Sequence, residues 1–349
     1  MSEARSLIAE TVNRLFADSV DAETIARAET GVWTADLWRA VEEAGLTRAL
    51  LTSKSGGADG DWLDVFEIAR AAGRHAVPLP LVETILGTWI LERAGMEIPA
   101  GPIGLATGSF PADGRGSLAR VPWGRNAAHL VGLVASGPVA RVGCIPRERL
   151  GVEEGQNLAL EARDTLLLDG TPPTLGDVEV APRTIELYGA LLRCGQMTGA
   201  LEQILDQSVL YASERVQFGR PIGNFQVIQQ ELARLAGQVA EAVTATEIAF
   251  GAAAEAEGAA LGTIGAPSDP TFEIACAKIV GGEAAELGPR IAHQVHGAIG
   301  FTYEHSLHFS TRRLWAWRAE FGLAEAWAAE LGKAVQRAGG EIWPLVTSR

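Results

Sequence analysis

Apolar residues recur every three or four positions over most of the chain, which is the spacing of an amphipathic α-helix. One such stripe covers residues 185–209, and a second covers residues 225–243. The residues that separate them include Gly219, Pro221 and Gly223. Because glycine and proline favour tight turns, the pattern predicts two antiparallel helices joined by a short connection.

The first ninety-nine residues also have a helical pattern, in shorter pieces. Apolar positions repeat over residues 7–16, 37–44 and 65–69, and a further apolar stretch covers residues 82–91. A glycine-rich loop precedes the third piece and ends in Asp61, a residue type that commonly caps the start of a helix. We expect an N-terminal helical domain, residues 1–99.

The pattern changes at about residue 100, where glycine and proline become frequent and the helical spacing disappears. Short apolar runs replace it, and such runs are typical of β-strands. The predicted strands are residues 119–122, 130–135, 139–145 and 165–168. We expect a small β-domain, residues 100–182.

Helical spacing returns at Thr184 and continues to the end of the chain. A glycine- and proline-rich stretch, residues 258–270, interrupts it, and further apolar stripes begin near residues 272, 307 and 323. The sequence predicts a C-terminal antiparallel bundle of four or five helices, residues 183–349. The expected fold class is therefore mainly α with a small β-domain.

Composition narrows the class of protein. With 349 residues the chain can bury a substantial core. Its net charge of −14 opposes binding to nucleic-acid phosphates. The three cysteines, at positions 144, 194 and 276, are widely separated, so neither a disulfide framework nor a zinc site is expected. Nor do the histidines stand in a recognised ligand pattern, so we expect no metal.

No uncharged apolar run is long enough to cross a membrane, and no membrane span is expected. The N-terminal residues mix acids and bases without an apolar signal core. From these two features we expect a cytoplasmic protein.

The connection between the two long helical stripes has unusual chemistry. Arg215, Gln217, Phe218 and Arg220 stand within six residues of one another. A plain helical hairpin needs none of them, although solvated arginines and an anchoring aromatic residue are an equally simple interpretation. Arginine offers forked donors to anionic oxygens, so the group could bind a phosphate-bearing ligand such as a dinucleotide.

Two stretches carry a family resemblance. SERVQFGRPIGNFQ, residues 213–226, and QVHGAIGFTYEH, residues 294–305, resemble the two C-terminal signatures of acyl-CoA dehydrogenases, in the family's order. The resemblance implies an N-terminal helical domain, a middle β-domain and a C-terminal helical bundle. It also implies FAD as cofactor, with contacts from Arg215, Gln217, Phe218, Gln226, Gln294 and Gly297.

The resemblance further implies an acyl-CoA substrate and an electron-transfer flavoprotein or similar acceptor. In that family, residues of these signatures reach a flavin bound mainly by the neighbouring subunit, so the resemblance implies a homo- or hetero-oligomer, a dimer or a tetramer. The resemblance is poor over residues 100–182, where we find no match to the family's flavin-facing segments. Whether this shorter β-domain itself holds FAD is left open.

The resemblance also bears on the catalytic base. An acyl-CoA dehydrogenase removes an α-proton with a carboxylate while the flavin takes the β-hydride. Counting along the two signatures puts Phe321 and Gly189 at the two positions where family members carry that carboxylate. Glu320 stands one residue before the first position, and Glu186 stands almost one helical turn before the second, so these two are the candidates.

Four functions are compatible with these observations. The leading one is FAD-dependent α,β-dehydrogenation of an acyl-CoA thioester. The others are a non-catalytic subunit that completes the FAD site of a catalytic partner, an acyl-CoA-binding scaffold without redox activity, and a flavin monooxygenase on the same fold. Glu304, in the second signature, is expected to pair with Arg312 or Arg313 rather than to take part in chemistry.

Overall fold

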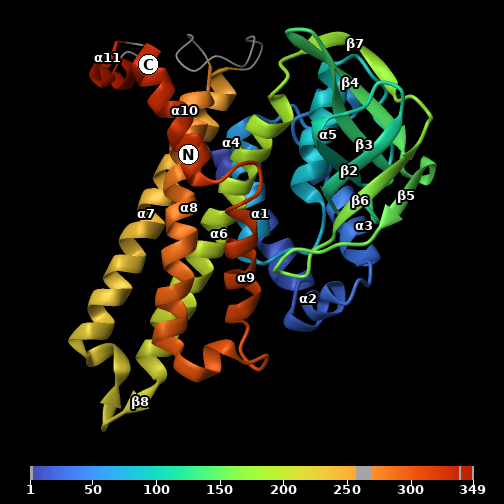
Figure 1. Cartoon of the computed structure of the whole chain (residues 1–349). Helices are drawn as coiled ribbons and strands as arrows, with labels where there is room; N and C mark the ends of the chain where they lie inside the picture. The colour runs from blue at the N-terminus through green and yellow to red at the C-terminus, as the bar shows by residue number, and fades with distance from the viewer. Residues whose placement is uncertain (1–2, 257–268, 338, 348–349) are drawn as a thin grey trace.

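Helices dominate the computed structural model, which describes residues 3–256, 269–337 and 339–347 (Figure 1). They form both the N-terminal part and the part after residue 183, and seven strands occupy the stretch between. The expected fold class, mainly α with a small β-region, is confirmed.

Five helices make up the N-terminal part, as the short apolar stripes predict. Their bounds are α1 Glu3–Ser19, α2 Ala22–Glu29, α3 Ala35–Glu43, α4 Trp62–Arg74 and α5 Leu81–Arg93. Two 3₁₀ turns, η1 Leu46–Arg48 and η2 Ser53–Ser55, lie between α3 and α4. Asp61 caps α4 as expected. Its carboxylate accepts a hydrogen bond from the backbone N–H of Asp64, and the Asp64 carboxylate accepts one from the backbone N–H of Asp61.

The strands form two packed sheets. Their bounds are β1 Ile103–Ser109, β2 Arg115–Pro122, β3 His129–Ser136, β4 Val139–Pro146, β5 Leu150–Glu153, β6 Arg163–Asp169 and β7 Thr174–Val180, with a 3₁₀ turn, η3 Arg147–Arg149, before β5. One sheet has the order β1-β3-β4-β7 and the other β2-β6-β5. Only β1 and β3 pair in parallel. Between the sheets lies a separate small core that includes Phe110, Leu130 and Leu166.

Four of the seven strands match the predicted apolar runs, and β1, β5 and β7 were missed. The sequence of β1, IGLATGS, contains two glycines and no alternation of apolar and polar residues. β5 is only four residues long. Neither carries the period-two signal on which strand prediction depends.

The C-terminal part is a bundle of long antiparallel helices. Its elements are α6 Thr184–Glu214, β8 Val216–Gln217, β9 Arg220–Pro221, η4 Ile222–Asn224, α7 Gln226–Glu255, α8 Thr271–His296, η5 Gly297–Phe301, α9 Leu307–Trp317, α10 Ala324–Arg337 and α11 Ile342–Thr347. The predicted pair of helices with a short connection is confirmed. The predicted break at residues 258–270 lies almost wholly outside the described residues.

One continuous core joins the N-terminal helices, the first sheet and the bundle. Its centre is aromatic: the ring of Trp62 stacks on Tyr188 with centroids 4.6 Å apart and meets the edge of Trp89 at 5.1 Å. Helices α4 and α6 approach so closely that a Cβ at Gly73 would lie 1.8 Å from the Gln196 carbonyl oxygen. This close contact fixes the N-terminal helices against the bundle.

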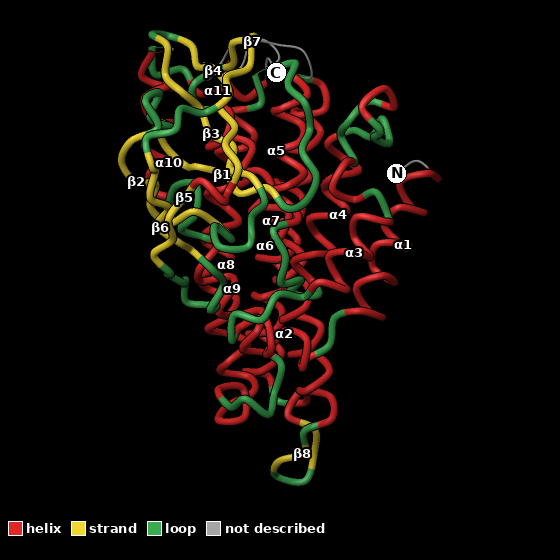
Figure 2. The backbone as a smooth tube through the Cα atoms, turned by 90° about the vertical axis from the view of Figure 1, so that its right-hand side faces the viewer, coloured by secondary structure: helices red, strands yellow, loops and turns green. Residues whose placement is uncertain are grey.

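Figure 2 shows the β-region on one side of the helices, with the β8–β9 hairpin projecting at the far end of the molecule. Among the described residues, no helix is both long and apolar enough to cross a membrane. The three cysteines are free; Cys194 is buried, and the other two are half-buried. Burial raises the pKa of Cys194 to about 12, so its thiol is not ionised at neutral pH.

Candidate functional site

A cleft of about 520 Å³ lies between the β-region and the start of α6. Small side chains line much of it, and the turn after α9 closes one side. The lining residues that matter below are Thr107 and Ser109 on β1, Arg120 on β2, Arg163 on β6, Glu186 on α6, and Glu320 and Phe321 after α9.

Both carboxylates named from the sequence, Glu186 and Glu320, line this one cleft. Glu186 lies in the first turn of α6 and has 46 % of its side-chain surface exposed. The guanidinium of Arg183 holds it through two hydrogen bonds, of 3.0 and 3.1 Å. Glu186 is therefore accessible from the cleft, with its charge partly balanced.

Glu320 has a different environment, because two buried arginines hold it. Arg163 donates to one carboxylate oxygen and Arg193 donates to the other, both at 2.7 Å. Burial alone would raise the pKa of Glu320, but the two guanidiniums outweigh that effect and lower the pKa to about 2. A carboxylate of such low proton affinity is a weak base.

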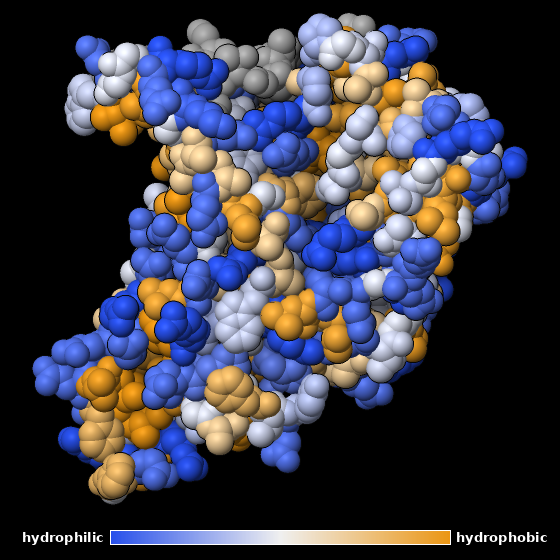
Figure 3. Space-filling model, viewed as in Figure 1, coloured by the Kyte–Doolittle hydropathy of each residue, from blue (hydrophilic) through white to orange (hydrophobic). Residues whose placement is uncertain are grey.

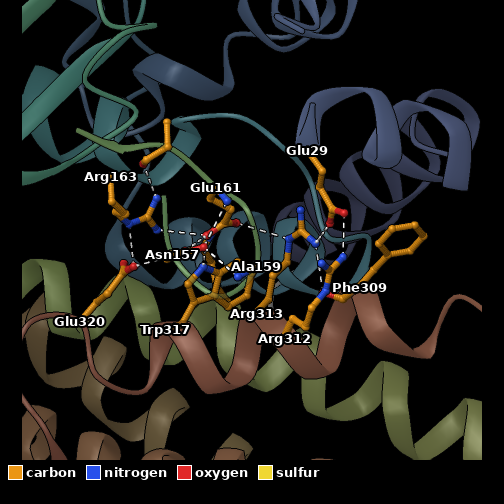
Figure 4. Close-up of polar contacts among 12 residues, drawn as sticks. Glu29, Asn157, Ala159, Glu161, Arg163, Phe309, Arg312, Arg313, Trp317 and Glu320 are labelled. Atoms are coloured by element: carbon orange, nitrogen blue, oxygen red, sulfur yellow. Dashed lines mark hydrogen bonds and ion pairs between the residues drawn. The ribbon is translucent and has the colours of Figure 1, made fainter. Parts of the chain in front are cut away.

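Glu320 belongs to a chain of eight alternating charges that runs through the molecule, most of which is drawn in Figure 4. The successive members are Glu83, Arg193, Glu320, Arg163, Glu161, Arg313, Glu29 and Arg312. They come from α5, α6, the turn after α9, the β-region, α9 and the end of α2. The network ties all three parts of the chain together, and Glu320 sits within it.

The expected pairing of Glu304 is wrong. Arg312 and Arg313 both pair with Glu29, at 2.6 and 3.3 Å. The partner comes from the end of α2, almost three hundred residues away in sequence, so local spacing gave no sign of it.

The turn after α9 is strained and firmly held. Phe321 has φ +55° and Gly322 has φ +99°, both in the left-handed region. The indole of Trp327 donates to the Phe321 carbonyl at 3.0 Å. The Lys278 ammonium donates to the Arg318 carbonyl at 2.8 Å. These bonds direct the Phe321 ring toward α6, where it packs on Gly189.

Sequence reasoning missed the part of the cleft that β1 and β2 form. Thr107, Ser109 and Arg120 are all exposed and line the cavity. No motif marks these three residues. Strand β1 was not recognised, and the prediction of a strand over residues 119–122 gave no reason to single out Arg120. The only local signal was the excess of glycine around them.

The other residues named from the sequence lie at the opposite end of the bundle. In the β8–β9 hairpin Gln217 pairs with Arg220, and both central residues, Phe218 and Gly219, have positive φ, as in a type I′ turn. Phe218 is 92 % exposed. The guanidinium of Arg220 lies over the ring of Phe225 at 4.2 Å. The hairpin thus presents an aromatic tip flanked by polar side chains.

The helix ends next to the two signatures meet at this end of the bundle. Tyr211, at the end of α6, stacks on His296, at the end of α8, with centroids 4.6 Å apart. Gln207 donates to the Ser306 hydroxyl at 2.9 Å. Gln226 begins α7, and Gln294 and Gly297 lie at the end of α8. Segments eighty residues apart in sequence are therefore neighbours.

The polar side chains at this end are available to a ligand. Arg215, Gln217, Gln226 and Gln294 are all exposed. Within the described part of the chain, none of the four has a side-chain hydrogen bond or ion pair. Figure 3 shows apolar side chains over the same end, and the exposed apolar residues of these segments include Val209, Leu210, Val216, Phe218 and Val227.

The cleft and the hairpin end are far apart. Glu186 and Arg215 stand 29 residues apart along α6 and its C-terminal cap. At 1.5 Å per residue this is about 44 Å. The two groups of residues therefore cannot hold the same small molecule within one chain.

In the part of the chain that the structure describes, no group of three histidine, cysteine or carboxylate side chains could hold a metal ion. The histidines of the second signature pack on aromatic rings instead. His296, for example, stacks on Tyr211 with centroids 4.6 Å apart.

Family models for two domains match this chain and define its class. The acyl-CoA dehydrogenase N-terminal domain matches residues 2–98, and the acyl-CoA dehydrogenase C-terminal domain matches residues 185–331. The chain belongs to the acyl-CoA dehydrogenase family. It is thus an FAD-dependent oxidoreductase that acts on the CH–CH bond of acyl-CoA thioesters.

Curated relatives agree with this assignment. Acyl-CoA dehydrogenase IpdE2 of Mycolicibacterium smegmatis is 28 % identical over 325 residues, which cover 90 % of this chain and 93 % of the relative. Acyl-CoA dehydrogenase FadE34 of Mycobacterium tuberculosis is also 28 % identical, over 80 % of this chain but only 40 % of its own length.

Solved structures show the same fold. The ChsE4-ChsE5 complex from Mycobacterium tuberculosis superposes with a TM-score of 0.84 at 19 % identity, over 96 % of this chain and 98 % of the other. Butyryl-CoA dehydrogenase from Megasphaera elsdenii gives 0.81 at 17 % identity, over 96 % and 99 %. The overall arrangement of helices and strands is therefore that of the family.

Proposed function

We propose that this chain is one subunit of an oligomeric FAD-dependent acyl-CoA dehydrogenase, and that its hairpin end contacts the FAD of a neighbouring subunit. The main support for this proposal is the distance of about 44 Å along α6 between Glu186 in the cleft and Arg215 at the hairpin end. A chain that acted alone would leave the four exposed polar side chains at the hairpin end without a ligand.

The residues at the hairpin end fit the cofactor. Arg215 offers forked donors suited to the pyrophosphate, and Gln217, Gln226 and Gln294 offer amide groups to the rest of the dinucleotide. Phe218 provides an exposed ring for stacking, and Gly297, with φ +63°, lets backbone approach closely. FAD, when bound, supplies the acceptor for the β-hydride.

Within the cleft, Glu186 is the better candidate for the residue that receives the α-proton. Glu320 lines the same cavity, but two guanidiniums stabilise its charged form and make it a weak base. Glu186 is nearly half exposed and has one arginine partner. A small rotation of its side chain would leave Arg183 paired with Glu330, which already binds it at 2.7 Å.

The test is turnover of a panel of acyl-CoA thioesters with an artificial electron acceptor. We expect Glu186→Gln to lower the rate by about two to four orders of magnitude, the usual contribution of a general base. Glu330→Gln is the matched control, because it removes the other carboxylate from Arg183 and does not line the cleft. If Glu186→Gln kept the parent rate, Glu186 would not be the base.

A second candidate function, a subunit without a base of its own, is favoured by the packing of Phe321 on Gly189. An aromatic ring and a glycine occupy the two positions where the family resemblance puts the base. In such an assembly the partner chain supplies the carboxylate, and this chain supplies Arg215 and Gln294. The solved ChsE4-ChsE5 complex, which has two named chains, makes a heteromeric arrangement the one to test first.

Two measurements separate these functions. Co-purification with the product of the neighbouring open reading frame, followed by a count of flavin per chain, tells a homo-oligomer from a heteromer. Turnover by the purified chain alone, abolished in Glu186→Gln, supports the catalytic role. Turnover only in the complex, unchanged by Glu186→Gln, supports the non-catalytic one. Electron-transfer flavoprotein is the acceptor to compare with the artificial dye.

A further inference from the structure

Strand β2 has a bulge where it borders the cleft. Leu118 pairs with Leu166 and Val121 pairs with Asp164, so Ala119 and Arg120 together face a single residue of β6. Bulges bend a strand locally and re-aim a side chain, and they are frequent next to active sites. Here the re-aimed side chain is Arg120, which lines the cleft.

The backbone at Arg120 is strained. Its φ is +56°, in the left-handed region that glycine occupies freely and that is unfavourable for a residue with a Cβ. Glycine is common in this part of the chain, yet the bulge carries a long charged residue. Strain that is kept at the wall of a cleft indicates a role for the side chain.

The charge of Arg120 is uncompensated. Among the residues that the structure describes, four charged side chains line the cleft, and three of them are paired: Arg163 with Glu320, and Glu186 with Arg183. Arg120 is exposed and has no hydrogen-bond or ion-pair partner among the described residues. In a chain of net charge −14, this leaves one free guanidinium facing the cavity.

Neutral donors line the same cleft. Thr107 and Ser109 of β1 line the cleft, and both are exposed. Gly108 stands between them with φ +102°, and a Cβ there would meet nothing within 4 Å, so the space beside the backbone is open. Two hydroxyls and a guanidinium that line one cleft form a donor set suited to an anionic oxygen group.

We infer that Arg120 binds an anionic group of the ligand in this cleft and determines which ligands the cleft accepts. The inference rests on the proposed function, in which the cleft takes an acyl-CoA. Three sources share the required chemistry: a carboxylate at the far end of the acyl chain, a phosphate of the CoA moiety, and a phosphate of FAD.

The experiment measures the dissociation constants of four probes for the full chain in its native assembly. The probes are hexanoyl-CoA, adipoyl-CoA, CoA and FAD; the first two differ only by a terminal carboxylate. The variants are Arg120→Ala, Arg120→Lys and Arg120→Gly. Arg149→Ala is the matched control, because Arg149 is also an exposed arginine of the β-region but does not line the cleft.

We expect Arg120→Ala to weaken binding of at least one probe about tenfold or more, as for the loss of a charge-assisted hydrogen bond. A loss confined to adipoyl-CoA assigns the partner to an acyl carboxylate. A loss of affinity shared by CoA and both thioesters identifies the partner of Arg120 as a CoA phosphate. A loss of affinity for FAD alone identifies the partner as a phosphate of FAD. Arg120→Lys should recover part of the affinity in each case.

Arg120→Gly distinguishes binding from a structural role. It relieves the backbone strain, so the melting temperature should not fall although the affinity does. If the three Arg120 variants bind all four probes like the parent and like Arg149→Ala, the inference is wrong and the proposed function stands. If the parent assembly binds neither an acyl-CoA nor FAD, the proposed function fails and the inference fails with it.

Discussion

The ring of Phe321 packs directly on Gly189, so closely that a Cβ at position 189 would lie 2.3 Å from Cε1 of the ring. The two residues are more than a hundred positions apart, and both stand where the family resemblance puts a catalytic carboxylate. One replaces the carboxylate with an aromatic ring, and the other provides the space for that ring. The pair therefore forms one packing unit at the wall of the cleft.

This contact predicts an unusual response to Gly189→Ala. Alanine inside a helix should stabilise by up to about 1 kcal/mol, but overpacking against the ring costs about 1 to 3 kcal/mol. We expect a net loss in the free energy of unfolding, measured by chemical denaturation. In the background of Phe321→Ala the clash is absent, so the same substitution should become stabilising. A destabilising effect of equal size in both backgrounds would show that the ring is not the obstacle.

The two buried ion pairs of Glu320 predict that Glu320→Gln lowers the free energy of unfolding. Glu320→Gln leaves Arg163 and Arg193 without a shared counter-charge, and removing one partner of a buried ion pair costs about 3 to 5 kcal/mol. Because the folded pKa is depressed, to about 2 from an ordinary value of 4.5, the charge stabilises the fold above pH 4.5. The difference between parent and variant should shrink as the pH falls from about 4.5 to about 2.

The control for this prediction is Glu286→Gln. Glu286 also pairs with an arginine, Arg318, but its side chain is 55 % exposed. An exposed pair contributes about 0 to 1 kcal/mol. Equal losses at the two positions would contradict the view that burial gives Glu320 its effect.

Lys278 predicts a pH dependence of the same sign in a more alkaline range. Its side chain is fully buried beside Cys194, and burial lowers its pKa to about 8 from 10.5. Between these values the unfolded chain binds more protons than the folded chain, so stability should rise with pH, by at most about 3 kcal/mol. Arg193, Arg318 and Glu320 also face the ammonium, so the rise is measured as a difference between parent and Lys278→Met. A slope that persists in Lys278→Met would assign it to another group.

The sequence predicted the long elements well, because their signals are local. The stripes before and after Gly219 locate α6 and α7, and Asp61 marks the start of α4. Strand β1 was missed because its glycines carry no alternation, and it was then impossible to see that Thr107 and Ser109 face the cleft. The boundaries of the three expected domains remain predictions, since one core joins all three parts.

The candidate site was predictable only in part, for a related reason. Counting along the signatures located Glu186, Glu320, Phe321 and Gly189, but their environments depend on partners far away in sequence. Nothing near Glu320 indicates that Arg163 holds it, because that arginine lies on β6, more than 150 residues earlier. The strained backbone of Arg120 likewise depends on a register shift between β2 and β6.

The last prediction concerns Arg215, at the hairpin end. Its guanidinium is exposed and unpaired among the described residues, so Arg215→Ala should leave the melting temperature of the chain unchanged. If Arg215 binds the FAD pyrophosphate of a neighbouring subunit, the substitution removes charge-assisted hydrogen bonds worth about 1.5 to 3 kcal/mol. We therefore expect flavin retention in the assembly to fall at least tenfold.

The measurement is flavin absorbance per chain after extensive dialysis of the native assembly. Arg234→Ala is the control, since Arg234 is an exposed arginine on α7 that pairs with Glu231 one turn earlier in the helix. A mixed assembly in which only this chain carries Arg215→Ala gives the sharpest result, because flavin should then be lost from sites to which the other chain contributes its β-region. If the altered assembly retains flavin as the parent does, Arg215 does not bind the cofactor, and the hairpin end must have another ligand.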